Sequence, residues 1–380
     1  MNATKKASKK GVLMPPAVGY SLNVVWALLR NHKIQVRYWP RFLLMVLINL
    51  INWPFRTYER LFINPRYRQL KEGTELIFIV GHWRSGTTHL HNLISQDPQM
   101  GYTTTYQSVF PDTLFNRLGY FIFEGFARLL IPGKRAGDNV RLGMQLPQEE
   151  EFALGAKTPL CFYYFWMFPK DIRRIYERSI RFKNASPSLI NQWNKDYELL
   201  ISKALKNTGT SIYLSKNPSH TGRVKHLLKR FPKAKFIFIH RNPVEVYLST
   251  DNFFKNMMPH LQLQQITKEE RQQSIIDLYK TIMKDFFDQK TLIPEGQYSE
   301  ISFDNLEQNP LKCVEYIYKA LNVEGYDAAK PQFQSFIDKM KSYEKNHHVI
   351  SQSQMESLLV QLRPSMEAFG YEIPKHIQVV

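Results

Sequence analysis

A segment rich in glycine and hydroxyl residues, Gly81-His-Trp-Arg-Ser-Gly-Thr-Thr88, has the composition of a phosphate-binding loop. It follows a short apolar run, and the residues after it are apolar at helical spacing, so we expect a strand, a tight loop and a helix. Backbone N–H groups at such a helix start bind phosphate. The lysine of triphosphate-binding loops is replaced by Thr87, and the positive charge stands inside the loop at Arg84. This pattern favours a nucleotide with one 5′-phosphate.

A second basic motif begins at Arg241, directly after the apolar run Lys235–His240. Ser249 follows eight residues later, about two turns along the helix that we expect after Pro243. Arg241 and Ser249 can therefore face one phosphate group. Either motif alone is a weak signal, but both follow predicted strands of one sheet.

Together the two motifs resemble the donor site of the sulfotransferases. The segment Trp83–Thr88 is similar to their 5′-phosphosulfate loop, and Arg241–Ser249 is similar to their 3′-phosphate site. The resemblance extends over about residues 75–310 and does not include the arm before residue 70. It implies that the donor is 3′-phosphoadenosine 5′-phosphosulfate, which leaves as adenosine 3′,5′-bisphosphate.

The resemblance assigns roles in the donor site to individual residues. It implies that Arg84, Ser85, Gly86, Thr87 and Thr88, beside Trp83, bind the 5′-phosphate. It implies that Arg241 and Ser249 bind the 3′-phosphate. His89 stands where many members have an aromatic residue against the adenine; the alternative is an ordinary polar contact on a helix. Lys216, which closes another predicted strand, matches a lysine that contacts the transferring group. A fixed cation there offsets the charge that develops on the leaving oxygen.

The general base is the least defined part of the predicted site. Family members use a histidine two residues after the lysine or a glutamate about twenty residues after the loop arginine, but Pro218 and Thr105 stand near those places. His220 is one substitute. We favour Glu150 or Glu151 in the run Pro147–Glu151, although acidic residues also stabilise a helix start through its dipole. The segment Tyr343–His348 could add donors to the 3′-phosphate, or be a plain polar loop.

The motifs imply the elements that position them. The apolar runs 75–81, 211–216, 235–240 and 297–303 alternate with helical patterns, which predicts a parallel sheet with helices on both faces. Ligands of such sheets bind at the carboxyl ends of the strands, where every motif falls. The fold class is thus α/β, a three-layer fold of the P-loop type with a largely helical insertion at about residues 105–205.

The insertion contains two aromatic stretches, Gly119–Phe126 and Leu160–Phe168. We interpret them as the walls of an apolar acceptor pocket, although aromatic residues are also the usual material of a core. A sterol-like or lipid acceptor fits this interpretation best, and an anionic glycan is the alternative. We expect one sulfotransferase domain over residues 71–380.

The 380-residue chain has a net charge of +18, and nine basic residues precede the first acidic one, Glu59. Such a bias favours anionic partners, or simply keeps a basic tail soluble. We expect a disordered tail over residues 1–20 and no nucleic-acid partner. Only Cys161 and Cys313 occur, far apart, which argues against a zinc site or a disulfide framework and for a reducing, cytoplasmic location. No metal is expected.

The run Phe42–Trp53 is apolar for about a dozen residues, fewer than the roughly 20 that span a bilayer. Two interpretations fit it: a helix in a membrane interface, with contact through residues 20–56 at the inner face of a membrane, or a helix that covers the core. Two other classes of function remain as alternatives, a P-loop kinase and a non-catalytic membrane-associated module. The missing loop lysine argues against the kinase.

Overall fold

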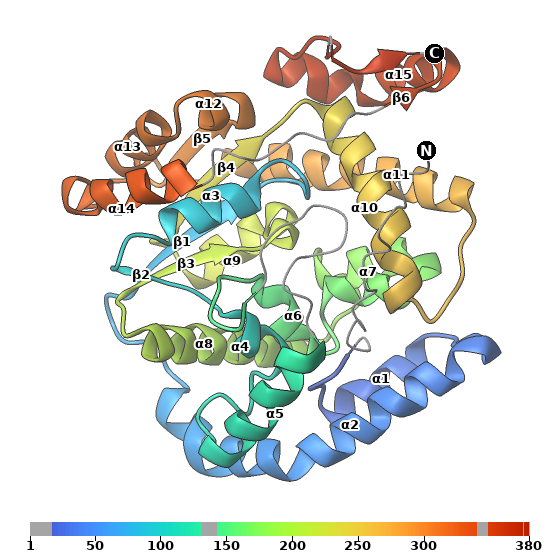
Figure 1. The fold of residues 1–380 in the computed structure, drawn as a ribbon, viewed down its shortest axis with the longest axis vertical. Coiled ribbons are helices and arrows are strands. Elements are labelled where there is room, and N and C mark those ends of the chain that lie inside the picture. The colour runs from blue at the N-terminus through green and yellow to red at the C-terminus, as the bar shows by residue number, and fades with distance from the viewer. Residues whose placement is uncertain (1–16, 131–142, 340–348, 375, 380) are drawn as a thin grey trace, which may run out of the picture.

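Five parallel strands form the central sheet (Figure 1). The computed structural model describes residues 17–130, 143–339, 349–374 and 376–379. Across the sheet the order is β2 (Met100–Gly101), β3 (Ile212–Lys216), β1 (Glu75–Val80), β4 (Lys235–His240) and β5 (Tyr298–Ser302). The four strands predicted from the sequence are therefore present within one residue at each end, and the two-residue β2 was not predicted.

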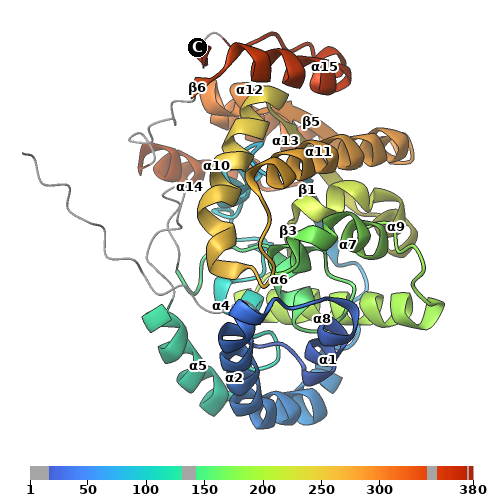
Figure 2. The ribbon, with the colours of Figure 1, turned by 90° about the vertical axis from the view of Figure 1, so that its right-hand side faces the viewer.

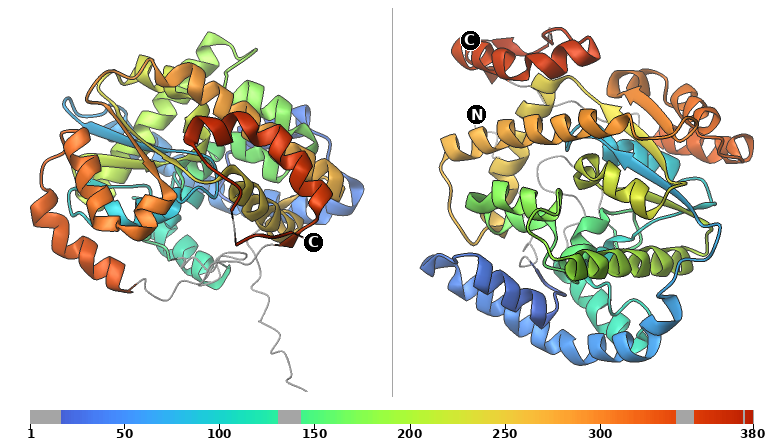
Figure 3. Two further views of the ribbon diagram at one scale, coloured as in Figure 1. Left: turned by 90° about the horizontal axis from the view of Figure 1, so that it is seen from above. Right: turned by 180° about the vertical axis from the view of Figure 1, so that it is seen from behind.

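The sheet is buried on both faces because its strands are apolar on both. In β1, Leu76, Phe78 and Val80 belong to one core cluster, while Ile77 and Ile79 belong to the other. The first face is covered by α8 (Pro187–Thr208), α9 (Val224–Arg230), α10 (Pro243–Leu261) and α11 (Lys268–Lys290). The second is covered by α3 (Thr87–Ile94), α12 (Phe303–Gln308), α13 (Pro310–Ala320) and α14 (Tyr326–Lys339). Figure 3 shows these helices on both sides of the sheet, which confirms the three-layer prediction.

The segment between β2 and β3 is helical, as predicted. Its elements are α4 (Thr105–Val109), α5 (Arg117–Leu130), α6 (Glu150–Gly155), the short helices η4 (Phe162–Trp166) and η5 (Pro169–Asp171), α7 (Ile172–Ser179) and the long α8. The two aromatic stretches separate in space. Phe162 and Phe165 are fully buried, whereas Phe121 in α5 is 77% exposed. The second stretch is therefore buried throughout, whereas Phe123 is the only buried ring of the first.

The N-terminal arm consists of α1 (Leu22–Asn31), η1 (Val36–Tyr38), α2 (Trp39–Tyr58), a π-helical turn η2 (Glu59–Ile63) and η3 (Asn64–Tyr67). The apolar run that we predicted to end at Trp53 is part of the 20-residue α2, which continues through Pro54. None of the helices in the described ranges is sufficiently long and apolar to cross a membrane.

The arm is joined to the rest of the protein by buried ion pairs. Lys203 in α8 pairs with Glu59, and both side chains are fully buried. Arg56 lies 2.7 Å from Asp112. The arm therefore packs as part of the folded unit rather than as a separate tail.

The chain ends with α15 (Gln352–Phe369) and a small parallel pair of strands, β6 (Val349–Ile350) and β7 (Gln378–Val379). Most of the predicted basic tail, up to residue 16, and the segment Tyr343–His348 lie outside the described residues.

Candidate active site

The loop between β1 and α3 is shaped by contacts within the protein. Arg84 and Gly86 both have positive φ, 71° and 97°. A side chain at residue 86 would meet the ring of Phe303 at 2.2 Å, so glycine is needed there. The Ser85 hydroxyl donates to the carbonyl of His82 at 2.7 Å, and the N–H of Gly81 donates to the Thr221 hydroxyl at 2.8 Å. The cradle shape therefore does not depend on a bound phosphate.

The loop arginine is held by the helix that follows β4. Arg84 Nε donates to Ser249 Oγ at 2.9 Å, and its guanidinium lies over the ring of Phe253, 5.2 Å from the centroid. Arg84 and Ser249, which the resemblance placed in the two halves of the donor site, are thus in direct contact. An anion bound between them would receive hydrogen bonds from both the loop and α10.

Arg241, predicted to bind the 3′-phosphate, pairs with a carboxylate of the protein in this structure. Its Nε donates to Oε2 of Glu245, in the first turn of α10, at 3.0 Å, and its guanidinium lies over Phe303 at 4.7 Å. Glu245 also lies 2.8 Å from Nε2 of His376. Arg241 therefore lies beside the loop, paired with the carboxylate of Glu245.

His89 lies on the side of α3 that faces α14, with its ring 6.5 Å from that of Phe336. Burial lowers its pKa, so the ring is neutral near pH 7. A flat neutral ring is compatible with the predicted contact to an adenine. Thr87 is buried in the first turn of the helix, and Thr88 is half-buried.

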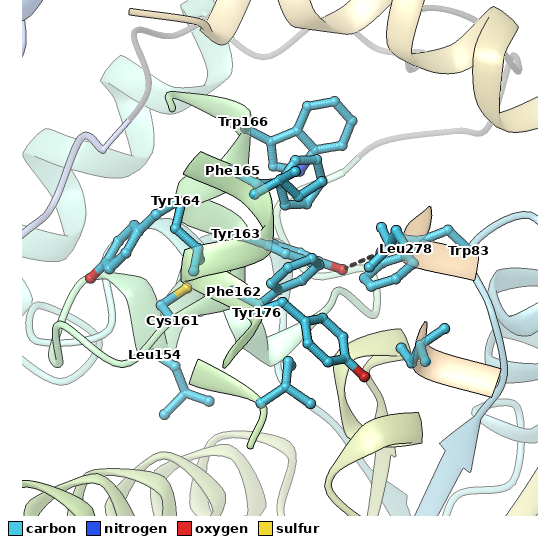
Figure 4. Close-up of a cluster of buried hydrophobic side chains, with 14 of the residues drawn as sticks. Trp83, Leu154, Cys161, Phe162, Tyr163, Tyr164, Phe165, Trp166, Tyr176 and Leu278 are labelled. Carbon is cyan, nitrogen blue, oxygen red and sulfur yellow. Dashed lines mark hydrogen bonds between the residues drawn. The ribbon is translucent and has the colours of Figure 1, made fainter. Parts of the chain in front are cut away.

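Lys216 at the end of β3 pairs with a carboxylate that the sequence did not single out. Its Nζ lies 2.5 Å from Glu149 Oε1, and the two side chains are 2% and 10% exposed. The other oxygen of Glu149 accepts a hydrogen bond from the Tyr163 hydroxyl. That hydroxyl in turn accepts from the indole N–H of Trp83 at 3.0 Å, the dashed line in Figure 4. A hydrogen-bonded chain therefore connects β3 to the phosphate loop.

The Tyr163 hydroxyl stays protonated. Burial, and after it the Glu149 carboxylate, raise the pKa of Tyr163 well above its usual range. The phenol therefore remains a hydrogen-bond donor to Glu149 at any physiological pH.

Glu150 and Glu151, which we favoured as the base, are in the first turn of α6 and point into the protein interior. Glu151 forms two bonds with Arg223, of 2.6 and 2.9 Å, and accepts from the N–H of Phe162 at 2.7 Å. Burial opposes its ionisation, but Arg223 outweighs burial and the pKa of Glu151 is lowered to about 2. Glu150 accepts hydrogen bonds from Ser215 and Tyr197. Both carboxylates are fully buried, an environment typical of residues that stabilise a fold.

His220, the other predicted base, is fully buried as well. Its Nε2 lies 2.9 Å from the Tyr197 hydroxyl and 3.3 Å from Glu150 Oε1. Burial lowers the pKa of His220. The structure thus brings together Trp83, Arg84, Ser249 and Lys216, and it places Glu150, Glu151 and His220 in a buried network behind them.

An aromatic wall borders the Lys216–Glu149 pair. It is formed by η4 and by the helices that it contacts. Phe152 packs edge-on against Tyr163 at 4.7 Å, and Trp166 contacts Phe254 at 4.8 Å. Figure 4 shows the rings of η4 extending from Trp83 past Tyr163 to Trp166. Among the described residues no three His, Cys, Asp or Glu side chains are grouped so that they could hold a metal ion.

Comparisons with known proteins agree with this geometry. A model described as "Sulfotransferase family" matches residues 76–328. The chain is similar to the omega-hydroxy-beta-dihydromenaquinone-9 sulfotransferase Stf3 of Mycobacterium bovis, with 25% identity over 94% of this chain and 92% of the relative.

Two solved structures have the same fold. The sulfotransferase STF9 of Mycobacterium avium has a TM-score of 0.68, with 15% identity over 93% of this chain and 91% of that one. The sulfotransferase STF1 of Mycobacterium tuberculosis has a TM-score of 0.62, also with 15% identity, over 90% and 91% of the two chains.

Proposed function

Because the chain belongs to the sulfotransferase family, we propose that it transfers a sulfuryl group from 3′-phosphoadenosine 5′-phosphosulfate to a hydroxyl of a lipid-like acceptor. The observation that carries this proposal is the Lys216–Glu149 pair, which Tyr163 of the aromatic wall links to Trp83 of the phosphate loop. Sulfuryl transfer needs a base for the acceptor proton and a cation for the leaving oxygen. The pair supplies both at one point.

In the proposal, the loop and α10 bind the donor. The backbone N–H groups at the start of α3, with Ser85, Thr87 and Thr88, receive the 5′-phosphate, and Arg84 and Ser249 lie beside it. Arg241 exchanges its bond to Glu245 for the 3′-phosphate. His89 and Phe303 flank the adenine. A side chain at residue 86 would collide with Phe303, which supports a tight fit at this point.

The reaction itself is an in-line displacement at sulfur. Glu149 takes the proton of the acceptor hydroxyl, whose oxygen forms the new bond to sulfur. The bond between sulfur and the bridging oxygen of the 5′-phosphate breaks, and Lys216 stabilises the negative charge that develops on that oxygen. Tyr163 holds Glu149 in place through its hydrogen bond. The products are the sulfated acceptor and adenosine 3′,5′-bisphosphate.

The acceptor is proposed to be apolar or amphipathic. The wall beside Glu149 consists of Phe152, Tyr163, Phe165 and Trp166, which are mostly buried and offer flat apolar surfaces. The name of the mycobacterial relative specifies a menaquinone derivative that carries a terminal hydroxyl. An isoprenoid alcohol of this kind fits a wall of aromatic rings better than a charged glycan does.

The remaining proposals concern organisation and location. We propose a helical arm up to residue 70 and one catalytic domain from residue 71 onward. We place the protein in the cytoplasm, in contact with the inner face of a membrane through residues 20–56. Two buried free cysteines, Cys161 and Cys313, are compatible with a reducing compartment.

The proposal is tested by incubating the protein with radiolabelled phosphosulfate donor and a panel of isoprenoid quinols, sterols and glycans. We expect one sulfated product, from the isoprenoid or sterol class, identified by mass spectrometry. Product from no acceptor class, with folded protein that binds the donor, would refute the activity. Hydrolysis of a nucleoside triphosphate that depends on magnesium would instead favour a kinase or ATPase.

A further inference from the structure

The outward face of α2 is apolar over most of its length. The side chains that point away from the protein are Leu43, Leu44, Leu47, Leu50, Ile51 and Trp53, and each is 48–57% exposed. Soluble proteins rarely expose a contiguous apolar surface of this extent unless it contacts a partner.

The polar residues of α2 point inward, which is the reverse of the usual surface helix. Asn49 Oδ1 accepts from the backbone N–H groups of Gly19 and Tyr20 at 2.8 and 3.0 Å. Arg56 donates to the carbonyls of Gly19 and Ala156 at 2.8 and 2.9 Å. These bonds determine the rotation of the helix. Its leucines face outward because the bonded side chains of Asn49 and Arg56 hold the opposite side of the helix inside.

Helix α5 extends the same surface. Figures 1 and 2 show it beside α2 at one end of the molecule. On its inner side, Phe123 packs edge-on against Phe55 of α2, 5.7 Å between ring centroids. On its outer side, Phe121 is 77% exposed and Leu118 is 61% exposed, with Ile122 and Phe126 next to them. We call the outward residues of both helices the apolar face.

The charge around the apolar face indicates which partner it fits. Glu59 is the only acidic residue between residues 17 and 70, and it is buried against Lys203. Exposed basic residues of the same segment are Arg30, Lys33, Arg37, Arg60, Arg66 and Arg68. A second copy docked on this face would bring many positive charges together. An anionic lipid surface would complement both the apolar side chains and the charge.

The residues that lead to the proposed catalytic carboxylate contact the inner side of α5. Met144 belongs to the same buried cluster as Phe123, and Gln145 donates to the Tyr120 hydroxyl of α5 at 2.7 Å. Glu149 follows in the same segment, at the start of α6. The element that presents Glu149 thus packs against the helix that presents the apolar face.

We propose that the apolar face of α2 and α5 docks in the surface of an anionic lipid bilayer, with both helices lying in the plane of the interface. The inference rests on the proposed function in one respect: the acceptor is a membrane lipid, which then reaches Glu149 from the docked side. It deepens the contact proposed for residues 20–56, because it adds α5 and specifies anionic lipid.

Vesicle flotation without donor or acceptor tests the docking. Phosphatidylglycerol–phosphatidylethanolamine vesicles are compared with phosphatidylcholine vesicles. We expect wild-type protein to float with the anionic vesicles and to be released by added salt. Phe121→Glu, and Leu47→Glu with Phe121→Glu, are expected to reduce the bound fraction on the order of tenfold. Val360→Glu is the matched control, because Val360 is 68% exposed on α15, at the opposite end of the molecule in Figure 1.

Each outcome has a defined meaning. Equal loss of binding for Val360→Glu, or equal binding of wild-type protein to both kinds of vesicle, would contradict the proposal. A third result would also contradict it: wild-type protein that is a dimer, floats with neither kind of vesicle and becomes a monomer in the Leu47→Glu variant. The apolar face would then be covered by a second copy of the chain. Wild-type protein that floats as expected but forms no sulfated product leaves the docking intact and refutes the proposed function instead. Thermal unfolding of each variant shows whether it is folded.

Discussion

Two networks of charged side chains lie on either side of Lys216, and they differ in how completely their carboxylates are bonded. On the loop side, Glu149 contacts Lys216 and Tyr163 and retains some exposure. On the core side, Glu151 is fully buried and receives bonds from Arg223, Asn217 and the N–H of Phe162. The two glutamates are two positions apart in the sequence. A carboxylate that can gain a proton during a reaction needs a free approach, whereas one enclosed by donors stabilises the fold.

The sharpest way to test this difference is Glu149→Gln. We expect kcat to fall by about 10²–10⁴-fold, because the acceptor hydroxyl loses its base. Donor affinity, measured by calorimetry, should stay close to that of the wild type. The unfolding temperature should fall, because the buried Lys216 loses its counter-charge, so turnover is measured at a temperature at which the variant is folded. Turnover near the wild-type value would show that Glu149 is not the base.

For Glu151→Gln we expect mainly a loss of folding stability. Its amide leaves the Arg223 guanidinium buried without a counter-charge, so the free energy of unfolding should fall by about 3–5 kcal/mol. Urea denaturation measures this loss. Glu124→Gln is a suitable control, since Glu124 pairs with the exposed Arg128 and surface pairs of this kind contribute little to stability. An equal loss of stability in both variants would show that the buried Glu151–Arg223 pair contributes no more to stability than a surface pair.

The core-side network also makes stability depend on pH. The pKa of Glu151 is about 2 in the folded protein, against 4.5 for a free glutamate, so its stabilising effect is present above pH 4.5. It is lost as the pH falls towards 2, by about 3 kcal/mol in total. Denaturation measured across this range should show the loss in wild-type protein and a smaller one in Glu151→Gln. Identical pH profiles would mean that other groups cause the acid sensitivity.

The smallest effect is expected for Tyr163→Phe, which removes one hydrogen bond from Glu149. We expect kcat to fall about tenfold with an unchanged KM for the donor, which corresponds to about 1.4 kcal/mol. Tyr164→Phe is the matched variant, because the Tyr164 hydroxyl donates to the carbonyls of Gly155 and Thr158 and not to Glu149. If both variants lose turnover equally, Tyr163 acts through the packing of η4 alone.

The fold around the predicted donor motif was predictable because it is local: the strand, the glycine loop and the helix are adjacent in the chain. The contacts of Arg241 and Ser249 were not, since Arg241 bonds to Glu245 and Ser249 to Arg84. The proposed base, Glu149, could not be predicted in the same way, because its place depends on where α6 begins. Glu149 precedes the helix with extended backbone, ψ 122°, while Glu150 and Glu151 are in its first turn. A shift of one residue in the start of α6 would therefore change which carboxylate faces Lys216. The sequence does not show at which residue the helix starts, and the Glu149–Lys216 contact is seen only in the folded structure.

The orientation of α2 was hidden for a related reason. Its apolar run predicts a helix, and the sequence left a buried and an interfacial position open. Asn49 and Arg56 face inward because their bonding partners, Gly19, Tyr20 and Ala156, are brought there by tertiary contacts. No periodicity within the helix contains this information.

The distribution of carboxylates in the arm has a consequence for regulation. Between residues 17 and 70 the exposed charges are all arginine or lysine, and Glu59 is enclosed with Lys203. Arginine and lysine keep their charge from acidic to mildly alkaline conditions. An attachment based on such groups works as a constant electrical anchor and not as a proton-driven switch. If the proposed docking is correct, added salt or a change in lipid composition would release the protein, whereas mild acidification would leave these positive charges unchanged.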